Sequence, residues 1–90
     1  MSVKVHVLSS LRMFTDDQEA IEVEGTTVGE CLMDLSDMYP AIEDEILYPD
    51  GKLNEEYEIW INAENAHPDA LAREVKDGDD VYITLQQTGG

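Results

Sequence analysis

The chain has 90 residues, with 21 acidic against 5 basic side chains and a formal net charge of -16. The length fits one domain. The excess of carboxylates argues against nucleic-acid binding and anionic membranes, since both rely on cationic side chains, and it favours a basic partner. Because 42% of the residues are hydrophobic and fall in periodic runs, the chain is expected to fold.

The cysteine count and the hydropathy pattern indicate in which cellular compartment the protein is expected. A single cysteine, Cys31, excludes an internal disulfide and any iron–sulfur or cysteine-based zinc site. No stretch approaches the ~20 apolar residues of a membrane helix, and the first ten residues alternate instead of forming a signal-peptide block. We therefore expect a cytoplasmic protein.

The first half of the chain predicts two strands and a helix. Segments 3–7 and 21–24 alternate apolar and polar residues, which indicates two strands that pair as a hairpin. Thr27 and Glu30 have the spacing of a capping box, and Pro40 is expected to end the helix. The buried face of this helix is predicted to carry Val28, Cys31, Leu32, Leu35 and Met38.

The second half predicts two more strands. Segment 41–53 has mixed signals, with Ile46 and Leu47 as candidate core anchors. Segment 58–62 is β-branched and aromatic, and segment 81–85 alternates, so both are predicted to be strands. One helical turn is expected after Pro68. The order of elements predicts an α+β fold, with one main helix on a mixed sheet of four to five strands.

Conventional catalytic groups are sparse. His6 and His67 are predicted to be surface histidines, and Cys31 a buried and unreactive thiol. The acidic clusters lack the spacing of a calcium loop, and no phosphate-binding, dinucleotide or zinc motif occurs, so no metal site is expected.

The C-terminus carries the strongest functional signal. Segment 86–90 (QQTGG) follows the last predicted strand without an apolar anchor, and it ends in Gly89-Gly90. Glycines without a Cβ can enter a narrow channel, and five extended residues reach about 16–18 Å. The Gly90 carboxylate could thus enter another protein's active site, where it needs activation because an ionised carboxylate is a poor electrophile.

With this tail, the chain resembles the sulfur carriers of the ThiS/MoaD superfamily, which are β-grasp relatives of ubiquitin. The resemblance spans Val3 to Gly90, and the length is similar to that of the longer MoaD-like members. One departure is Leu85-Gln86-Gln87, where many relatives carry a proline. The matching segments are VKVHVL, TTVGECLMDL, IWIN, Leu71 to Val75 leading into KDGDDVYI, and the terminal Gly-Gly.

The resemblance implies a β-grasp roll over residues 1–85 and a flexible tail over residues 86–90. It further implies that a ubiquitin-activating type of enzyme uses ATP and magnesium to adenylate Gly90. A persulfide sulfurtransferase then supplies sulfur, and the resulting thiocarboxylate serves a synthase in molybdopterin, thiamine, thiolated tRNA or cysteine synthesis. Thr88, Gly89 and Gly90 would enter the partner's active site.

In this reading the chain binds no cofactor itself and is a protein cosubstrate, not a catalyst. One exception would be a role as the small subunit of a molybdopterin-synthase-like complex. Two alternatives stay open, namely a ubiquitin-like modifier joined through Gly90 to target lysines, and a non-covalent module with an inert tail.

Strand parity predicts a docking face. If Ile59 and Ile61 face the helix, then Trp60 faces away from it. By the same parity, the outward residues of the first and last strands are His6, Leu8, Tyr82 and Thr84. Exposed aromatic residues on a sheet often bind proteins. The alternative is that segment 41–53 folds back and covers Trp60.

Overall fold

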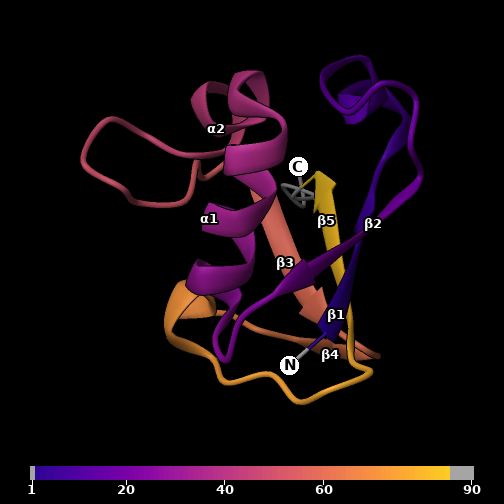
Figure 1. Cartoon of the computed structure of the whole chain (residues 1–90). Helices are drawn as coiled ribbons and strands as arrows, with labels where there is room; N and C mark the ends of the chain where they lie inside the picture. The colour runs from indigo at the N-terminus through magenta and orange to yellow at the C-terminus, as the bar shows by residue number, and fades with distance from the viewer. Residues whose placement is uncertain (1, 86–90) are drawn as a thin grey trace.

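The structure, a computed structural model, describes residues 2–85 and shows a five-stranded mixed sheet with its helices on one face (Figure 1). The strands are β1 (Ser2–Val7), β2 (Ala20–Glu24), β3 (Tyr57–Ile61), β4 (Glu64–Asn65) and β5 (Asp80–Leu85). The helices are α1 (Val28–Met38), α2 (Pro40–Ile46) and the 3-10 turns η1 (Ser9–Phe14) and η2 (Ala70–Ala72). This arrangement confirms the predicted α+β class.

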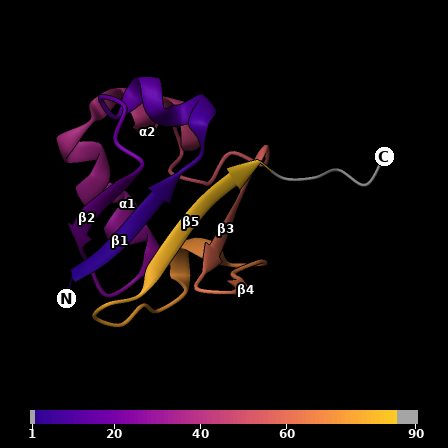
Figure 2. The same ribbon diagram turned by 90° about the vertical axis from the view of Figure 1, so that its right-hand side faces the viewer.

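The two chain-terminal strands lie side by side at the centre of the sheet, whose order is β2-β1-β5-β3-β4. β1 pairs with β5 in parallel, and Figure 2 shows them running in the same direction. β2 pairs antiparallel with β1, as the predicted hairpin requires, and β3 pairs antiparallel with β5. β5 is therefore hydrogen-bonded along both edges.

Alternation sorts the strand residues between two faces. The fully buried strand side chains all point towards α1, and they include Val5, Ile59, Val81 and Ile83. They meet the apolar stripe of α1, where Val28, Cys31, Leu32 and Leu35 are also completely buried. Met38 departs from the prediction, because it is 45% exposed at the last turn of the helix.

The start of α1 is capped by Thr27 and Glu30, as the sequence predicts. The hydroxyl of Thr27 accepts a hydrogen bond from the Glu30 backbone N–H at 3.2 Å. The Glu30 carboxylate reaches back and accepts from the backbone N–H and the hydroxyl of Thr26, both at 2.8 Å. These bonds lower the pKa of Glu30, with the backbone N–H of Thr26 as the largest cause.

The sequence analysis did not predict three elements, namely α2, η1 and β4. Pro40 does more than end α1, because it stands in the first turn of α2, where its missing N–H costs nothing. Ile42 and Ile46 from this helix are completely buried, so segment 41–53 is anchored to the core. η1 and β4 were also not predicted, whereas η2 fits the helical turn expected after Pro68.

Candidate functional site

β5 is the last described element before the C-terminal segment. Leu85, the last residue of β5, pairs with Tyr57 and is 49% exposed. The predicted tail, with Thr88, Gly89 and Gly90, lies outside the described residues. The C-terminal segment therefore follows a strand that is hydrogen-bonded to β1 on one side and to β3 on the other.

An aromatic row crosses the sheet face opposite α1. His6 on β1, Tyr82 on β5 and Trp60 on β3 stand in register, and each is half-buried. The rings of His6 and Tyr82 stack with centroids 4.4 Å apart and an interplanar angle of 11°. Thr84 lies next along β5 on the same face, level with Glu58. The strand register therefore places four of the five predicted docking residues on this face.

Carboxylates flank the row. Nε2 of His6 pairs with Oδ1 of Asp80 at 2.9 Å, which fixes the imidazole over Tyr82. On the other side, Nδ2 of Asn65 donates to Oε2 of Glu58 at 3.0 Å. His6 is thus held in place by a hydrogen bond that the sequence pattern alone does not show, because Asp80 lies 74 positions further along the chain.

Leu8 behaves differently from the rest of the predicted docking set. β1 ends at Val7, so the alternation does not extend to Leu8, which packs against the hydrophobic core instead. The alternative in which segment 41–53 covers Trp60 is wrong, because α2 and the loop after it lie on the α1 side of the sheet (Figure 1).

Cys31 and His67 are not brought together with other reactive groups. Burial is the main cause that raises the pKa of the Cys31 thiol to about 11, followed by the charges of Glu30 and Asp34. A neutral, fully buried thiol is a poor nucleophile, as predicted. His67 is exposed, and its backbone N–H donates to Oδ1 of Asn65 at 2.8 Å.

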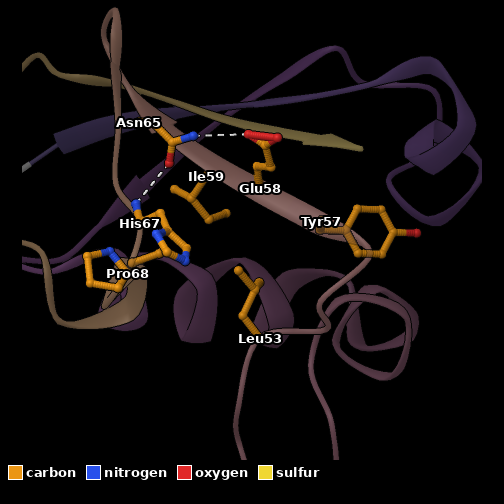
Figure 3. Close-up of a pocket in the computed structure, with 8 residues that line it drawn as sticks. Leu53, Tyr57, Glu58, Ile59, Asn65, His67 and Pro68 are labelled. Carbon is orange, nitrogen blue, oxygen red and sulfur yellow. Dashed lines mark hydrogen bonds between the residues drawn. The ribbon is translucent and has the colours of Figure 1, made fainter. Parts of the chain in front are cut away.

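His67 lines a pocket of about 460 Å³ beside β3, shown in Figure 3. Leu53, Ile59 and Pro68 supply apolar walls, and Asn65 links Glu58 to the His67 backbone. These contacts satisfy the polar groups of Asn65 and leave no nucleophile paired with a base among the described lining residues. The described lining of this pocket therefore gives no indication of catalysis.

Within residues 2–85, no three histidine, cysteine or acidic side chains are placed to hold a metal ion. No helix in the same part of the chain has the length and apolar character needed to cross a membrane.

Comparison with known proteins identifies the family. The model of the ThiS family matches residues 5–90, a span that includes the terminal Gly-Gly. A search of curated proteins found no match.

Solved structures agree with this match. The chain resembles one in the Amycolatopsis orientalis BexX/CysO complex, with a TM-score of 0.86 and 29% identity, covering 98% of this chain and 99% of that one. For Mycobacterium tuberculosis CysO, the TM-score is 0.86 and the identity 31%, covering 94% and 99%. For SAMP1 from Haloferax volcanii, the values are 0.84 and 25%, with both chains covered completely. The chain therefore belongs to the ThiS family, and it has the β-grasp fold of the sulfur carriers and ubiquitin-like modifiers.

Proposed function

We propose that this protein is a sulfur carrier whose Gly90 carboxylate is adenylated and then converted to a thiocarboxylate. The observation that carries the proposal is the family match through residue 90, which includes the Gly-Gly end. The similarity to CysO of Mycobacterium tuberculosis supports the same class of function. The chain is then a carried group and not a catalyst, unless it forms the small subunit of a synthase-like complex.

The chemistry divides into activation and sulfur delivery. A carboxylate oxygen of Gly90 attacks the α-phosphorus of ATP, pyrophosphate leaves, and an acyl-adenylate forms in the activating enzyme with its magnesium. The terminal sulfur of a persulfide then attacks the acyl carbon and displaces AMP. A second thiol cleaves the resulting acyl disulfide by thiol–disulfide exchange, which releases the thiocarboxylate. A synthase would consume that sulfur.

The geometry of the domain supports a mechanism in which the partner enzymes supply the active sites and this chain supplies only the carboxylate. β5 ends at Leu85, and five extended residues reach about 16–18 Å from that point. This length allows a partner to enclose the C-terminal carboxylate while the β-grasp domain stays outside. The chain then needs no cofactor of its own.

We propose that the activating enzyme docks on the aromatic row of His6, Tyr82 and Trp60, together with Thr84. Large aromatic side chains provide much contact area at a low cost in conformational entropy. Asp80 and Glu58 beside the row, and the net charge of -16, favour a partner with a basic docking surface.

Intact mass spectrometry tests the proposal. The protein is incubated with the family's adenylating enzyme, ATP, magnesium and a persulfide donor. We expect the mass gain of one sulfur atom replacing one oxygen, located at Gly90. Two controls should show no gain, namely a variant lacking Gly90 and a variant with one residue appended after it, whose terminal carboxylate is displaced by about 3.5 Å. A variant lacking Gly90 that is still thiolated at its new end would refute the proposal.

A ubiquitin-like modifier is the second candidate. It is favoured by the similarity to small archaeal modifier protein 1 from Methanosarcina acetivorans, with a TM-score of 0.84 and 28% identity. In this case a lysine amine attacks the activated Gly90 and displaces AMP. Chymotryptic peptides that carry the remnant QQTGG on a lysine, left by cleavage after Leu85, would establish conjugation. If neither thiolation nor conjugation occurs with the activating enzyme present, the chain is a non-covalent module.

A further inference from the structure

A recess lies on the helical side of the molecule, between the first turns of α1, the loop that follows α2, and η2. The loop protrudes at the left of Figure 1, and η2 lies in orange below it. The recess encloses about 520 Å³, which is within the range of about 300–1,000 Å³ that ligand sites occupy. His6, Tyr82 and Trp60 of the aromatic row do not line it.

The floor of the recess is apolar. Leu32 and Leu47 contribute aliphatic surface from α1 and from the end of α2, and Leu71 contributes it from η2. Gly29 allows α1 to approach η2 closely, because a Cβ at this position would lie 3.0 Å from the Leu71 carbonyl oxygen. The floor is thus formed by elements that are packed against one another.

Two of the large apolar side chains that the domain leaves in solvent stand at this recess. Met33 is 59% exposed and Tyr48 is 41% exposed, and both line it. Exposed apolar side chains beside an apolar hollow are typical of a protein-binding surface. Methionine also adapts its shape to different partners.

The charge around the recess has a single sign. Glu30, Glu43 and Asp44 line it, and none of the chain's five Lys and Arg residues does so, although all five are in the described part of the chain. The carboxylate of Glu30 is engaged with Thr26. Glu43 and Asp44 are exposed on α2, and neither side chain has a partner among the described residues.

We propose that this recess binds a basic amphipathic segment of a partner protein, with an apolar side chain on the floor and a Lys or Arg head at Glu43 and Asp44. Long cationic side chains cover apolar surface with their stems while the charged end stays at the rim, so one segment satisfies both features. The pairing of opposite charges would also fix the segment's register and raise its association rate.

This site is independent of the proposed sulfur chemistry. α1 and α2 cover one face of the sheet (Figures 1 and 2). The strand register places the aromatic row on the other face. A second protein could therefore hold the carrier by its helical side while an activating enzyme occupies the sheet face and the tail.

Two synthetic peptides test the proposal by NMR titration of the ¹⁵N-labelled full chain. One has leucines at helical spacing and lysines at its other positions, and the second has glutamates in place of the lysines. We expect the lysine peptide to shift the amide signals around Gly29, Met33, Asp44 and Leu71, and the glutamate peptide to shift none. Shifts spread over the acidic surface, or centred on Tyr82, would overturn the proposal.

Matched variants distinguish binding at the recess from non-specific attraction to the acidic surface. The double variant Glu43→Lys with Asp44→Lys should bind the lysine peptide about tenfold more weakly. The control, Asp37→Lys with Glu56→Lys, changes the net charge equally at exposed positions away from the recess, and it should bind as the parent does. Equal weakening in both doubles would overturn the proposal.

The apolar contribution has its own pair of variants. Met33→Ser should weaken binding of the lysine peptide, whereas Met13→Ser, at a methionine that is 74% exposed outside the recess, should not. Equal affinities for these two variants would overturn the role given to the apolar floor. No ATP or activating enzyme is present in these titrations, so their outcome does not depend on whether Gly90 is thiolated.

Discussion

Replacing Cys31 tests both the packing of α1 and the assignment of sulfur chemistry to the C-terminus. The thiol is completely buried on the apolar face of the helix. Its sulfur would lie 3.0 Å from a Cβ placed on Gly25, so the helix and the preceding turn are in close contact. Cys31→Ala removes the only thiol of the chain and adds no polar group.

At neutral pH, Cys31→Ala should cost about 1 kcal/mol, because only one heavy atom leaves the packed interior. Cys31→Ser should cost about 1–3 kcal/mol, because a hydroxyl is buried. A bond from that hydroxyl to the Thr27 carbonyl, one turn earlier in the helix, would offset part of this cost.

The cost should also depend on pH. Burial raises the pKa of Cys31 from 9.0 to about 11, so the folded protein keeps the thiol proton to higher pH than the unfolded chain does. The resulting stabilisation is complete below the unfolded pKa and is lost as the pH rises through the folded one. At about 1.4 kcal/mol per pKa unit, the stability of the parent relative to Cys31→Ala should fall by roughly 2–3 kcal/mol across this window, so the alanine variant should become the more stable of the two at the alkaline end.

Urea unfolding at a series of pH values measures that difference directly, and thiolation at Gly90 is measured on the same samples by intact mass. We expect the folded alanine variant to be thiolated as the parent is. A stability difference that stays constant between neutral and alkaline pH would refute the explanation of the raised pKa. A folded Cys31→Ala protein that no longer accepts sulfur would make this cysteine a functional thiol.

Trp60→Ala and Tyr82→Ala should each weaken binding to the activating enzyme by about 2 kcal/mol, roughly thirtyfold, while the melting temperature changes little because both side chains are only half-buried. A large drop in melting temperature with unchanged affinity would contradict the docking role. Tyr57→Phe should lower the urea-unfolding free energy by about 1–2 kcal/mol, because the phenol donates to Oε1 of Glu45 at 2.8 Å. Burial and this bond raise the pKa of Tyr57 from 10.0 to about 12, so the effect should fade between these pH values, and a pH-independent effect would count against it. Gly25→Ala should lower the melting temperature, because its Cβ would lie 2.8 Å from the Cys31 backbone nitrogen, and an unchanged value would show that the turn relaxes freely.

The strands and α1 could be predicted because their residues obey simple periods. Alternation in segment 3–7 predicts that Val5 and His6 lie on opposite faces of the sheet, and in the structure Val5 is buried whereas His6 is only half-buried. The same parity places Trp60 and Tyr82 on one face, although only the register of three strands shows that they stand in one row with His6.

What could not be predicted depends on geometry that local patterns do not carry. The sequence pattern at Pro40 predicts an end to α1, yet the fixed φ angle of proline also suits the first turn of a helix. The spacing of Ile42 and Ile46 is a helical signal that could have identified α2. The pairing of His6 with Asp80 joins residues 74 positions apart, so it requires the parallel contact of β1 and β5.

The central position of β5 also has a mechanical consequence. β1 and β5 run in parallel, so the start of the first strand and the end of the last lie at opposite ends of the sheet. A force between the start of β1 and the end of β5 therefore acts along the strands, in shear. The hydrogen bonds that join β5 to β1 and β3 must then break together and not one at a time. The domain is thus suited to remain folded while another protein grips its end.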